Sequence, residues 1–202
     1  MKANEVPQFY PKTKKAWRQW LQQHHDRANA VWLVQYKKSA GIPTISWSDA
    51  VDEALCFGWI DSVKKKLDEE RSIQYFTKRK PNSTWSKINK EKVARLITEG
   101  RMTPAGLAPI EAAQRNGSWE LLDSVDRLEV PEDLATALDA VPGARAFFEG
   151  CSPSNRKALL QWLVLAKSAA TRQKRIDSIA QLAGQGLKPA FLTGGAARPK
   201  KS

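Results

Sequence analysis

The chain has 202 residues, of which 42% are hydrophobic, and a formal net charge of +12. A chain of this length buries roughly 70% of its unfolded surface, so disorder over most of its length is excluded. It has no apolar run of about 18 residues, so we expect no membrane span. No apolar run follows the charged residue at the N-terminus, so we expect no signal peptide.

The first third of the sequence predicts a helix, a strand and a second helix. Apolar residues recur at helical spacing after Thr13, which suits an N-cap. The β-branched and aromatic run at 30–36 predicts a buried strand. Ser46, with an acidic residue three positions later, resembles a capping box, so a helix is expected from there to Phe57, where Gly58 ends it.

A β-hairpin is predicted next. Residues 59–67 and 71–78 are extended stretches separated by an acidic turn, and Trp59, Val63 and Leu67 are expected on one face. With the strand at 30–36, the sequence predicts a small antiparallel sheet of about three strands.

The rest of the chain has helical character. Ser83 or Ser86 can cap a helix that Gly100 ends, Thr103 and Pro104 begin another, and four more are expected from Val130 onward. The fold class is therefore α+β, with the small sheet packed against helices in the N-terminal half and an all-helical C-terminal part. We expect an α+β part at 1–120, a helical module at 121–184 and a flexible basic tail at 185–202, with residues 119–129 as a polar connection.

Two stretches carry a family resemblance. Residues 51–62 (VDEALCFGWIDS) and 79–89 (RKPNSTWSKIN) form a long, idiosyncratic pattern, and a helical pattern runs from Val130 to Ile176. Both resemble the YdeI/OmpD-associated family, also called bacteriocin-protection proteins, over roughly residues 14–184. The resemblance implies a cytoplasmic bacterial protein linked by name to bacteriocin tolerance, with no established reaction and no catalytic residue to carry over.

The two cysteines, Cys56 and Cys151, lack the spacing of a disulfide scaffold or a zinc site, so we expect a reducing cytoplasm. Cys56 shares a helix face with Asp52 and Glu53. Because negative neighbours disfavour a thiolate, a small buried side chain is favoured over a nucleophile.

The adjacent His24 and His25 cannot project from one helix face, and no metal-ligand spacing accompanies them. A solvated helix end is favoured for this pair, and we predict neither a metal nor another cofactor. The sequence also lacks the glycine-rich phosphate loops and the hydrolase elbow.

Three carboxylates surround the turn at residues 56–59. Asp52, Glu53 and Asp61 would support acid/base chemistry if they converged in a cleft. The favoured alternative is that Asp52 and Glu53 form the solvated side of an amphipathic helix and that Asp61 pairs with a lysine. An enzyme would use the region of Asp52, Cys56, Asp61 and Arg79.

A small anion pocket is the next hypothesis. Arg79 would be its bidentate partner and Trp85 its wall, with Ser86 and Asn89 beside a helix N-terminus. In the alternative, Arg79 and Asn89 bind backbone carbonyls in a structural clasp, and both interpretations stay open. The ligand-binding candidates are Asp52, Glu53, Cys56, Trp59, Asp61, Arg79, Lys80, Trp85, Ser86 and Asn89.

The segment 62–95 has the strongest charge excess, with eleven Lys or Arg residues against four acidic ones. Tyr75, Phe76 and Trp85 are interleaved with these cations, which favours single-stranded nucleic acid as a partner. Alternatively, the aromatic residues point into the core. Because Tyr75 and Phe76 are adjacent in a strand, they face opposite ways, so at least one can be exposed.

The preferred function is a binding role in bacteriocin or stress tolerance, directed at a small anionic ligand or a protein partner. A nucleic-acid-binding regulator and an enzyme are the alternatives. The sequence leaves the oligomeric state open.

Overall fold

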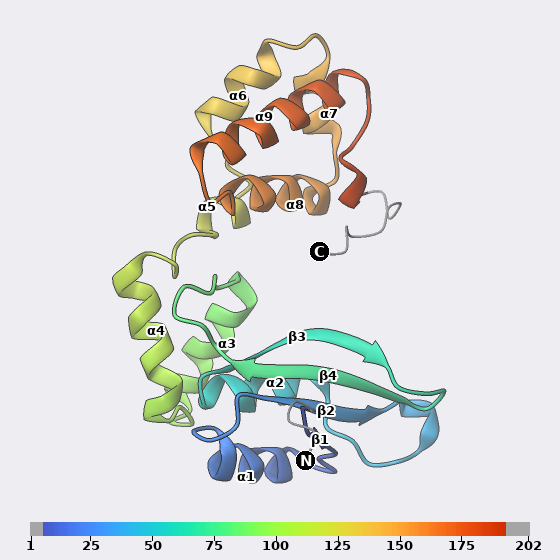
Figure 1. The fold of residues 1–202 in the computed structure, drawn as a ribbon, viewed down its shortest axis with the longest axis vertical. Helices are drawn as coiled ribbons and strands as arrows, with labels where there is room; N and C mark the ends of the chain where they lie inside the picture. Colours follow the sequence, from blue (N-terminus) through green and yellow to red (C-terminus); the bar gives the residue numbers. More distant parts are fainter. Residues whose placement is uncertain (1–5, 193–202) are drawn as a thin grey trace. The chain divides into compact units, whose positions relative to one another are not determined.

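A four-stranded sheet organises the first half of the chain in the computed structural model, which describes residues 6–192 (Figure 1). The described residues divide into two compact units, one ending at Trp119 (unit 1) and one beginning at Glu120 (unit 2). The sheet has the order β1-β2-β4-β3, formed by β1 (Gln8–Phe9), β2 (Ala30–Tyr36), β3 (Trp59–Lys66) and β4 (Arg71–Lys78). The α+β class is confirmed.

The sheet is mixed, whereas an antiparallel sheet of about three strands was predicted. β2 and β3 both run antiparallel to β4 as expected, but β1 pairs in parallel with β2. Because β1 has only two residues, it shows no alternation of apolar and polar side chains that could have revealed it.

The alternation predicted for the first strand of the hairpin is wrong beyond its beginning. The register between β3 and β4 shifts between Asp61 and Lys64. Such an irregularity redirects the side chains that follow it. Trp59 is fully buried, whereas Val63 and Leu67 are 46% and 37% exposed.

Helices cover one face of the sheet. Helix α1 (Lys14–His24) and helix α2 (Trp47–Cys56) pack against Val31 and Leu33 of β2 and Phe76 of β4. Residues 50–56 of α2 are all buried, so this helix is enclosed rather than amphipathic. The short helix η1 (Lys38–Ala40) follows β2.

Helix α3 (Lys87–Thr98) and helix α4 (Pro104–Asn116) complete unit 1, and both begin where the sequence predicts. The start of α4 packs directly on the end of α2. The amide and hydroxyl of Thr103 both donate to the carbonyl oxygen of Cys56. A Cβ atom at Gly106 would overlap that same carbonyl, so only glycine permits this approach.

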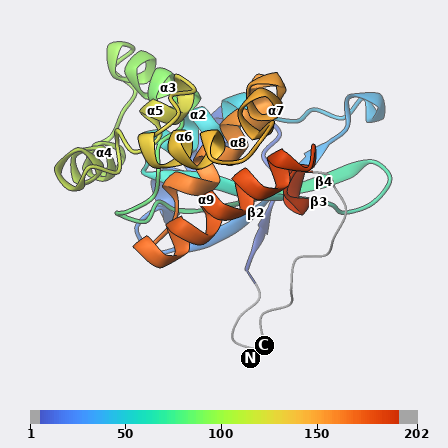
Figure 2. The same ribbon diagram turned by 90° about the horizontal axis from the view of Figure 1, so that it is seen from above.

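Unit 2 is helical. Its core combines residues from α5 (Asp123–Asp126), α6 (Glu132–Asp139), α7 (Ala144–Gly150), α8 (Pro153–Val164) and α9 (Ala169–Gly184), and η2 (Ala190–Leu192) follows (Figure 2). Four of these helices were expected. Residues 119–129 are not merely a polar connection, because Leu122 and Val125 are buried in the core of this unit. Most of the predicted flexible tail, 193–202, lies outside the described residues.

None of the helices within residues 6–192 has the length and apolar character needed to cross a membrane.

The contact between α2 and α4 can be tested at Gly106. We expect Gly106→Ala to lower the free energy of unfolding by about 1–3 kcal/mol, because the added methyl group meets rigid backbone. Urea unfolding followed by circular dichroism measures the effect. Gly150→Ala is the control, since a Cβ there meets nothing within 4 Å, and it should be neutral or stabilising by up to about 1 kcal/mol. Equal effects of the two substitutions would contradict the close contact.

Candidate functional site

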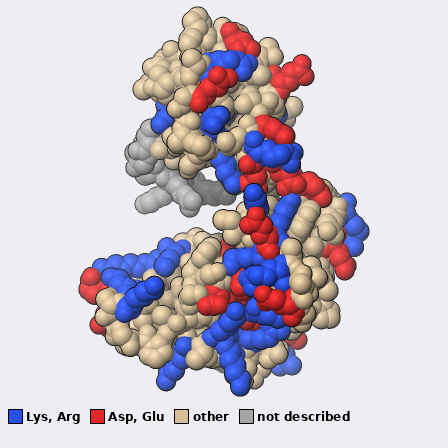
Figure 3. Space-filling model, turned by 180° about the vertical axis from the view of Figure 1, so that it is seen from behind, with Lys and Arg blue, Asp and Glu red and all other residues tan. Residues whose placement is uncertain are grey.

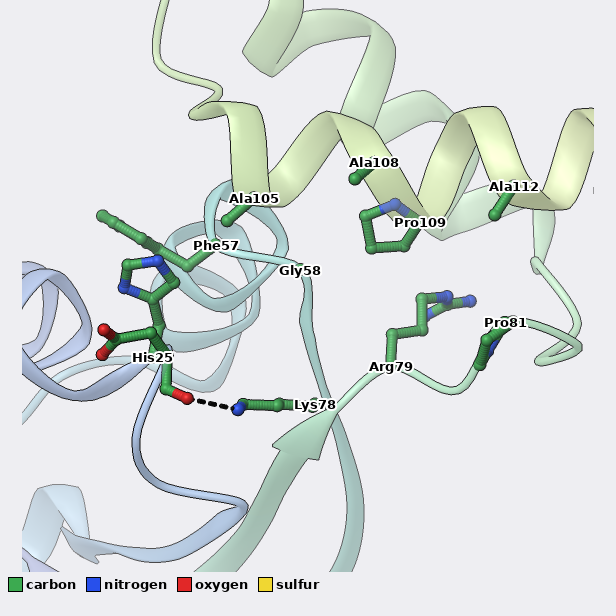
Figure 4. Close-up of a pocket in the computed structure, with 11 residues that line it drawn as sticks. His25, Phe57, Gly58, Lys78, Arg79, Pro81, Ala105, Ala108, Pro109 and Ala112 are labelled. Carbon is green, nitrogen blue, oxygen red and sulfur yellow. Dashed lines mark hydrogen bonds between the residues drawn. The ribbon is translucent and has the colours of Figure 1, made fainter.

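A cavity of about 450 Å³ lies in unit 1, where the end of β4 meets helix α4 and the turns after α1 and α2 (Figure 4). Ala105, Ala108, Pro109 and Ala112 lie three or four positions apart on one face of α4 and form an apolar wall. Their short side chains leave the space open. The remaining lining residues are His25, Asp26, Phe57, Gly58, Lys78, Arg79 and Pro81.

Arg79 is the buried charge of this cavity. The residue is 8% exposed, and its guanidinium carbon lies 3.5 Å from the ring centroid of Trp85. Its Nη2 donates to the carbonyl oxygen of Thr84 at 2.6 Å, whereas Nε and Nη1 are buried and have no hydrogen-bond partner among the described residues. Unpaired buried donors are costly, and a guanidinium readily pairs with a carboxylate or phosphate.

The charge on Arg79 persists despite its burial. Desolvation lowers the pKa of Arg79 to about 10, against the opposing influence of the Asp61 carboxylate. The guanidinium therefore remains protonated at neutral pH. It offers positive charge in an apolar setting, where an electrostatic interaction is stronger than in water.

His25 lines the cavity together with Phe57. The imidazole Nδ1 lies 2.9 Å from the carbonyl oxygen of Leu21. Since a carbonyl can only accept, Nδ1 carries the hydrogen of this contact. The His25 ring packs 5.3 Å from Phe57, and Lys78 Nζ donates to the Asp26 carbonyl oxygen at 2.7 Å (Figure 4). Sequence reasoning had assigned His25 only to a solvated helix end.

The other members of the predicted anion pocket do not line this cavity. Trp85 is buried beneath Arg79, and Ser86 caps α3 by accepting from the amide of Asn89 at 3.4 Å. Lys80 is exposed. Trp59 is fully buried, with its indole NH 3.4 Å from the carbonyl oxygen of His25. In the structural clasp considered above, Arg79 binds a backbone carbonyl, and its hydrogen bond to the Thr84 carbonyl oxygen is such a contact.

Asp52 and Glu53 are not on a solvated helix face, as was favoured, because both are at most 5% exposed. Asp52 accepts from Lys92 at 2.6 Å and from Arg95 at 2.5 Å. Burial alone would raise the pKa of Asp52, but these two cations outweigh it and hold that pKa below its ordinary value.

Glu53 forms a second buried ion cluster. It pairs with Arg18 of α1 at 2.8 Å and with Arg101, and Lys14 lies 3.9 Å away. The two carboxylates thus connect α2 to its neighbours. Cations from α1, from α3 and from the segment after α3 compensate for the cost of burying them.

Asp61 and Cys56 are also absent from the cavity lining. Asp61 does not pair with a lysine, since its carboxylate accepts from Trp47 Nε1 at 2.9 Å and Gln74 Nε2 at 3.1 Å. Cys56 is fully buried, and burial together with the charge of Glu53 raises the pKa of its thiol, although Arg18 opposes this. Of Asp52, Cys56, Asp61 and Arg79, only Arg79 therefore lines this cavity.

The basic segment 62–95 is neutralised only in part within unit 1. Lys66 pairs with Glu69 and Arg71 with Asp68, in addition to the two cations on Asp52. In Figure 3, Lys and Arg atoms lie beside Asp and Glu atoms over much of this unit. Phe76 and Trp85 are buried, whereas Tyr75 keeps partial exposure.

Among residues 6–192, no group of three or more His, Cys, Asp or Glu side chains is arranged to hold a metal ion.

Comparisons with known proteins match each of the two units to a different family. Residues 9–109 match a domain of unknown function (DUF8412), and residues 127–186 match a family described as "Bacteriocin-protection, YdeI or OmpD-Associated". The chain is thus an α+β domain of unknown function followed by a helical unit that is similar to a bacteriocin-protection family. Because the match at residues 9–109 covers half of the chain, the chain belongs to that family of unknown function, and its helical part is similar to the YdeI/OmpD-associated family.

A relative in Bacillus subtilis (strain 168), the "Uncharacterized protein YdeI", is 33% identical over 63 residues. The match covers 30% of this chain and 32% of that protein, so it spans about a third of the relative's length. No solved structure matches the chain.

The ion pairs of Asp52 predict a pH-dependent stability. A pKa lowered in the folded state means that ionised Asp52 stabilises the fold above its unfolded pKa of about 3.9, and that this stability is lost as pH falls through the folded pKa. Asp52→Asn should therefore lower the free energy of unfolding by about 2 kcal/mol at pH 7. This loss is smaller than for a fully buried ion pair, because Arg95 is partly exposed.

Urea unfolding of both proteins at pH 7 and pH 3 measures this difference, which should shrink at pH 3. The control is Glu91→Gln, which removes an exposed 3.9 Å pair on α3 and should change stability by at most about 0.5 kcal/mol. A pH-independent difference for Asp52→Asn would contradict the assigned ion pairs.

Proposed function

We propose that unit 1 binds a small organic anion that has an apolar body. The observation that carries this proposal is Arg79, a buried cation with two unpaired nitrogens that lines an apolar cavity. A carboxylate or phosphate would supply the missing hydrogen-bond acceptors and offset the desolvation of the guanidinium.

The dimensions and lining of the cavity support a small molecule as ligand. Its volume of about 450 Å³ lies within the range of small-molecule sites, roughly 300–1,000 Å³. The alanine side chains of α4 and the ring of Phe57 suit an aliphatic or aromatic body, while Arg79 fixes the charged end. A free inorganic anion would leave most of this apolar surface unused.

We further propose that this binding serves bacteriocin tolerance in the cytoplasm. The link to bacteriocins is supported by residues 127–186, which match a bacteriocin-protection family. A strain that lacks the protein should be more sensitive to a bacteriocin, and the wild-type gene should restore growth whereas an Arg79→Met variant should not. Full restoration by that variant would separate tolerance from the cavity.

Benzoate is a suitable probe of the Arg79 cavity, because it joins a carboxylate to a ring, and benzamide is its neutral counterpart. We expect isothermal titration to show that benzoate binds wild-type protein more tightly than benzamide does. Arg79→Met should weaken benzoate binding by roughly 10- to 100-fold, the size expected for a charge-assisted hydrogen bond of about 1.5–3 kcal/mol.

Arg115→Met is the matched control, because it removes a 73% exposed guanidinium from α4 and should leave benzoate binding unchanged. Circular dichroism verifies that each variant is folded. Phenyl phosphate, tested in the same way, distinguishes a phosphate from a carboxylate ligand. If Arg79→Met binds benzoate as well as wild-type protein does, Arg79 is a structural clasp only.

A further inference from the structure

The sheet face opposite α1 and α2 carries an aromatic pair. Trp32 of β2 and Tyr75 of β4 are direct cross-strand partners, with ring centroids 4.6 Å apart and planes tilted by 56°. Both side chains are partly exposed. The neighbours Val31 and Phe76 belong to the core, so strand alternation places Trp32 and Tyr75 on the other face. No helix of unit 1, as described, covers that face (Figure 1).

Cations accompany this pair. Lys65 Nζ lies 5.0 Å from the ring centroid of Trp32, and Lys65 is opposite Ile73 in the register of β3 and β4. Lys65 and its neighbour Lys64 are exposed and form no ion pair with the described residues. Only Lys65 shares the face of the aromatic pair, because Lys64 is opposite Gln74, which faces the core side of the sheet with Leu33. The charge around them favours a negative partner, because residues 1–119 contain 21 of the 33 Lys and Arg but only 12 of the 21 Asp and Glu.

We propose that this face binds single-stranded nucleic acid, with bases stacked on Trp32 and Tyr75 and a backbone phosphate at Lys65. Aromatic side chains beside cations on an open sheet offer a base a stacking surface and its phosphate a counter-charge. Lys65 leaves the ring of Trp32 as a base enters, and its ammonium group then meets the phosphate. A duplex is disfavoured, because its bases are stacked on one another.

The site is independent of the Arg79 cavity. None of Trp32, Tyr75 and Lys65 lines that cavity, and Arg79 follows the end of β4. Failure of one proposal therefore leaves the other standing, and Arg79→Met should bind nucleic acid as wild-type protein does.

The test is fluorescence anisotropy of the full chain with a labelled oligothymidylate of about 12 nucleotides. We expect binding at 50 mM salt that weakens about tenfold at 200 mM, as for two or three neutralised phosphates. Trp32→Ala and Tyr75→Ala should each weaken binding roughly tenfold, the loss of one stacked base. Trp32→Leu keeps apolar contact without a stacking surface, and it serves if the alanine variant fails to fold by circular dichroism.

Lys65→Glu has a matched control in Lys174→Glu, an identical charge change at an exposed position of α9. Lys65→Glu should weaken binding several-fold more than Lys174→Glu does. The proposal is overturned if both lysine variants bind alike while the aromatic variants bind like wild type. It is also overturned if duplex DNA binds equally well, or if anionic phosphatidylglycerol vesicles bind and the oligonucleotide does not.

Discussion

The close approach of α4 to the end of α2 is the constraint on which the cavity depends. The Cys56 carbonyl accepts from Thr103 in the first turn of α4, and the absence of a side chain at Gly106 permits the contact. Gly58 has a φ of 73° and also faces the backbone of α4, so the turn into β3 fits beneath that helix. Because β3 and α4 are fixed at this point, the alanine face of α4 is held opposite Arg79.

The buried carboxylates of α2 stabilise this arrangement from the other side. Asp52 and Glu53 cannot be solvated, and each is paired with cations from neighbouring segments, Lys92 and Arg95 for one and Arg18 and Arg101 for the other. Losing both cations of one carboxylate would leave a buried charge without compensation, which costs more than the pairs themselves contribute. The cluster therefore favours a single arrangement of α1, α2 and α3.

Local signals explain which parts of the fold were predictable. Thr13, Ser46 and Ser86 each accept a hydrogen bond from the amide three residues later, and these N-caps define helix starts from sequence alone. The solvated face expected for α2 was wrong because an amphipathic pattern assumes that carboxylates face water. Their burial depends on cations that are distant in sequence, such as Arg18 and Arg101.

The candidate site was predictable only in part for the same reason. Arg79 and Trp85 stood out because a cation and a large aromatic ring flank a helix start. His25 and the alanine face of α4 carry no chemical signal in the sequence, and only tertiary packing brings them to Arg79.

Two basic residues of unit 1 illustrate how burial assigns different roles to similar charges. Arg79 has lost its water and retains unpaired donors, so a partner must enter the protein and match a fixed geometry. Lys65 keeps its water and rests over an exposed ring, so its partner needs charge and a flat apolar surface but little shape. The net charge of +12 therefore does not correspond to a single binding property. Some cations stabilise the fold in ion pairs, Arg79 lines a selective cavity, and Lys65 lies on an open surface.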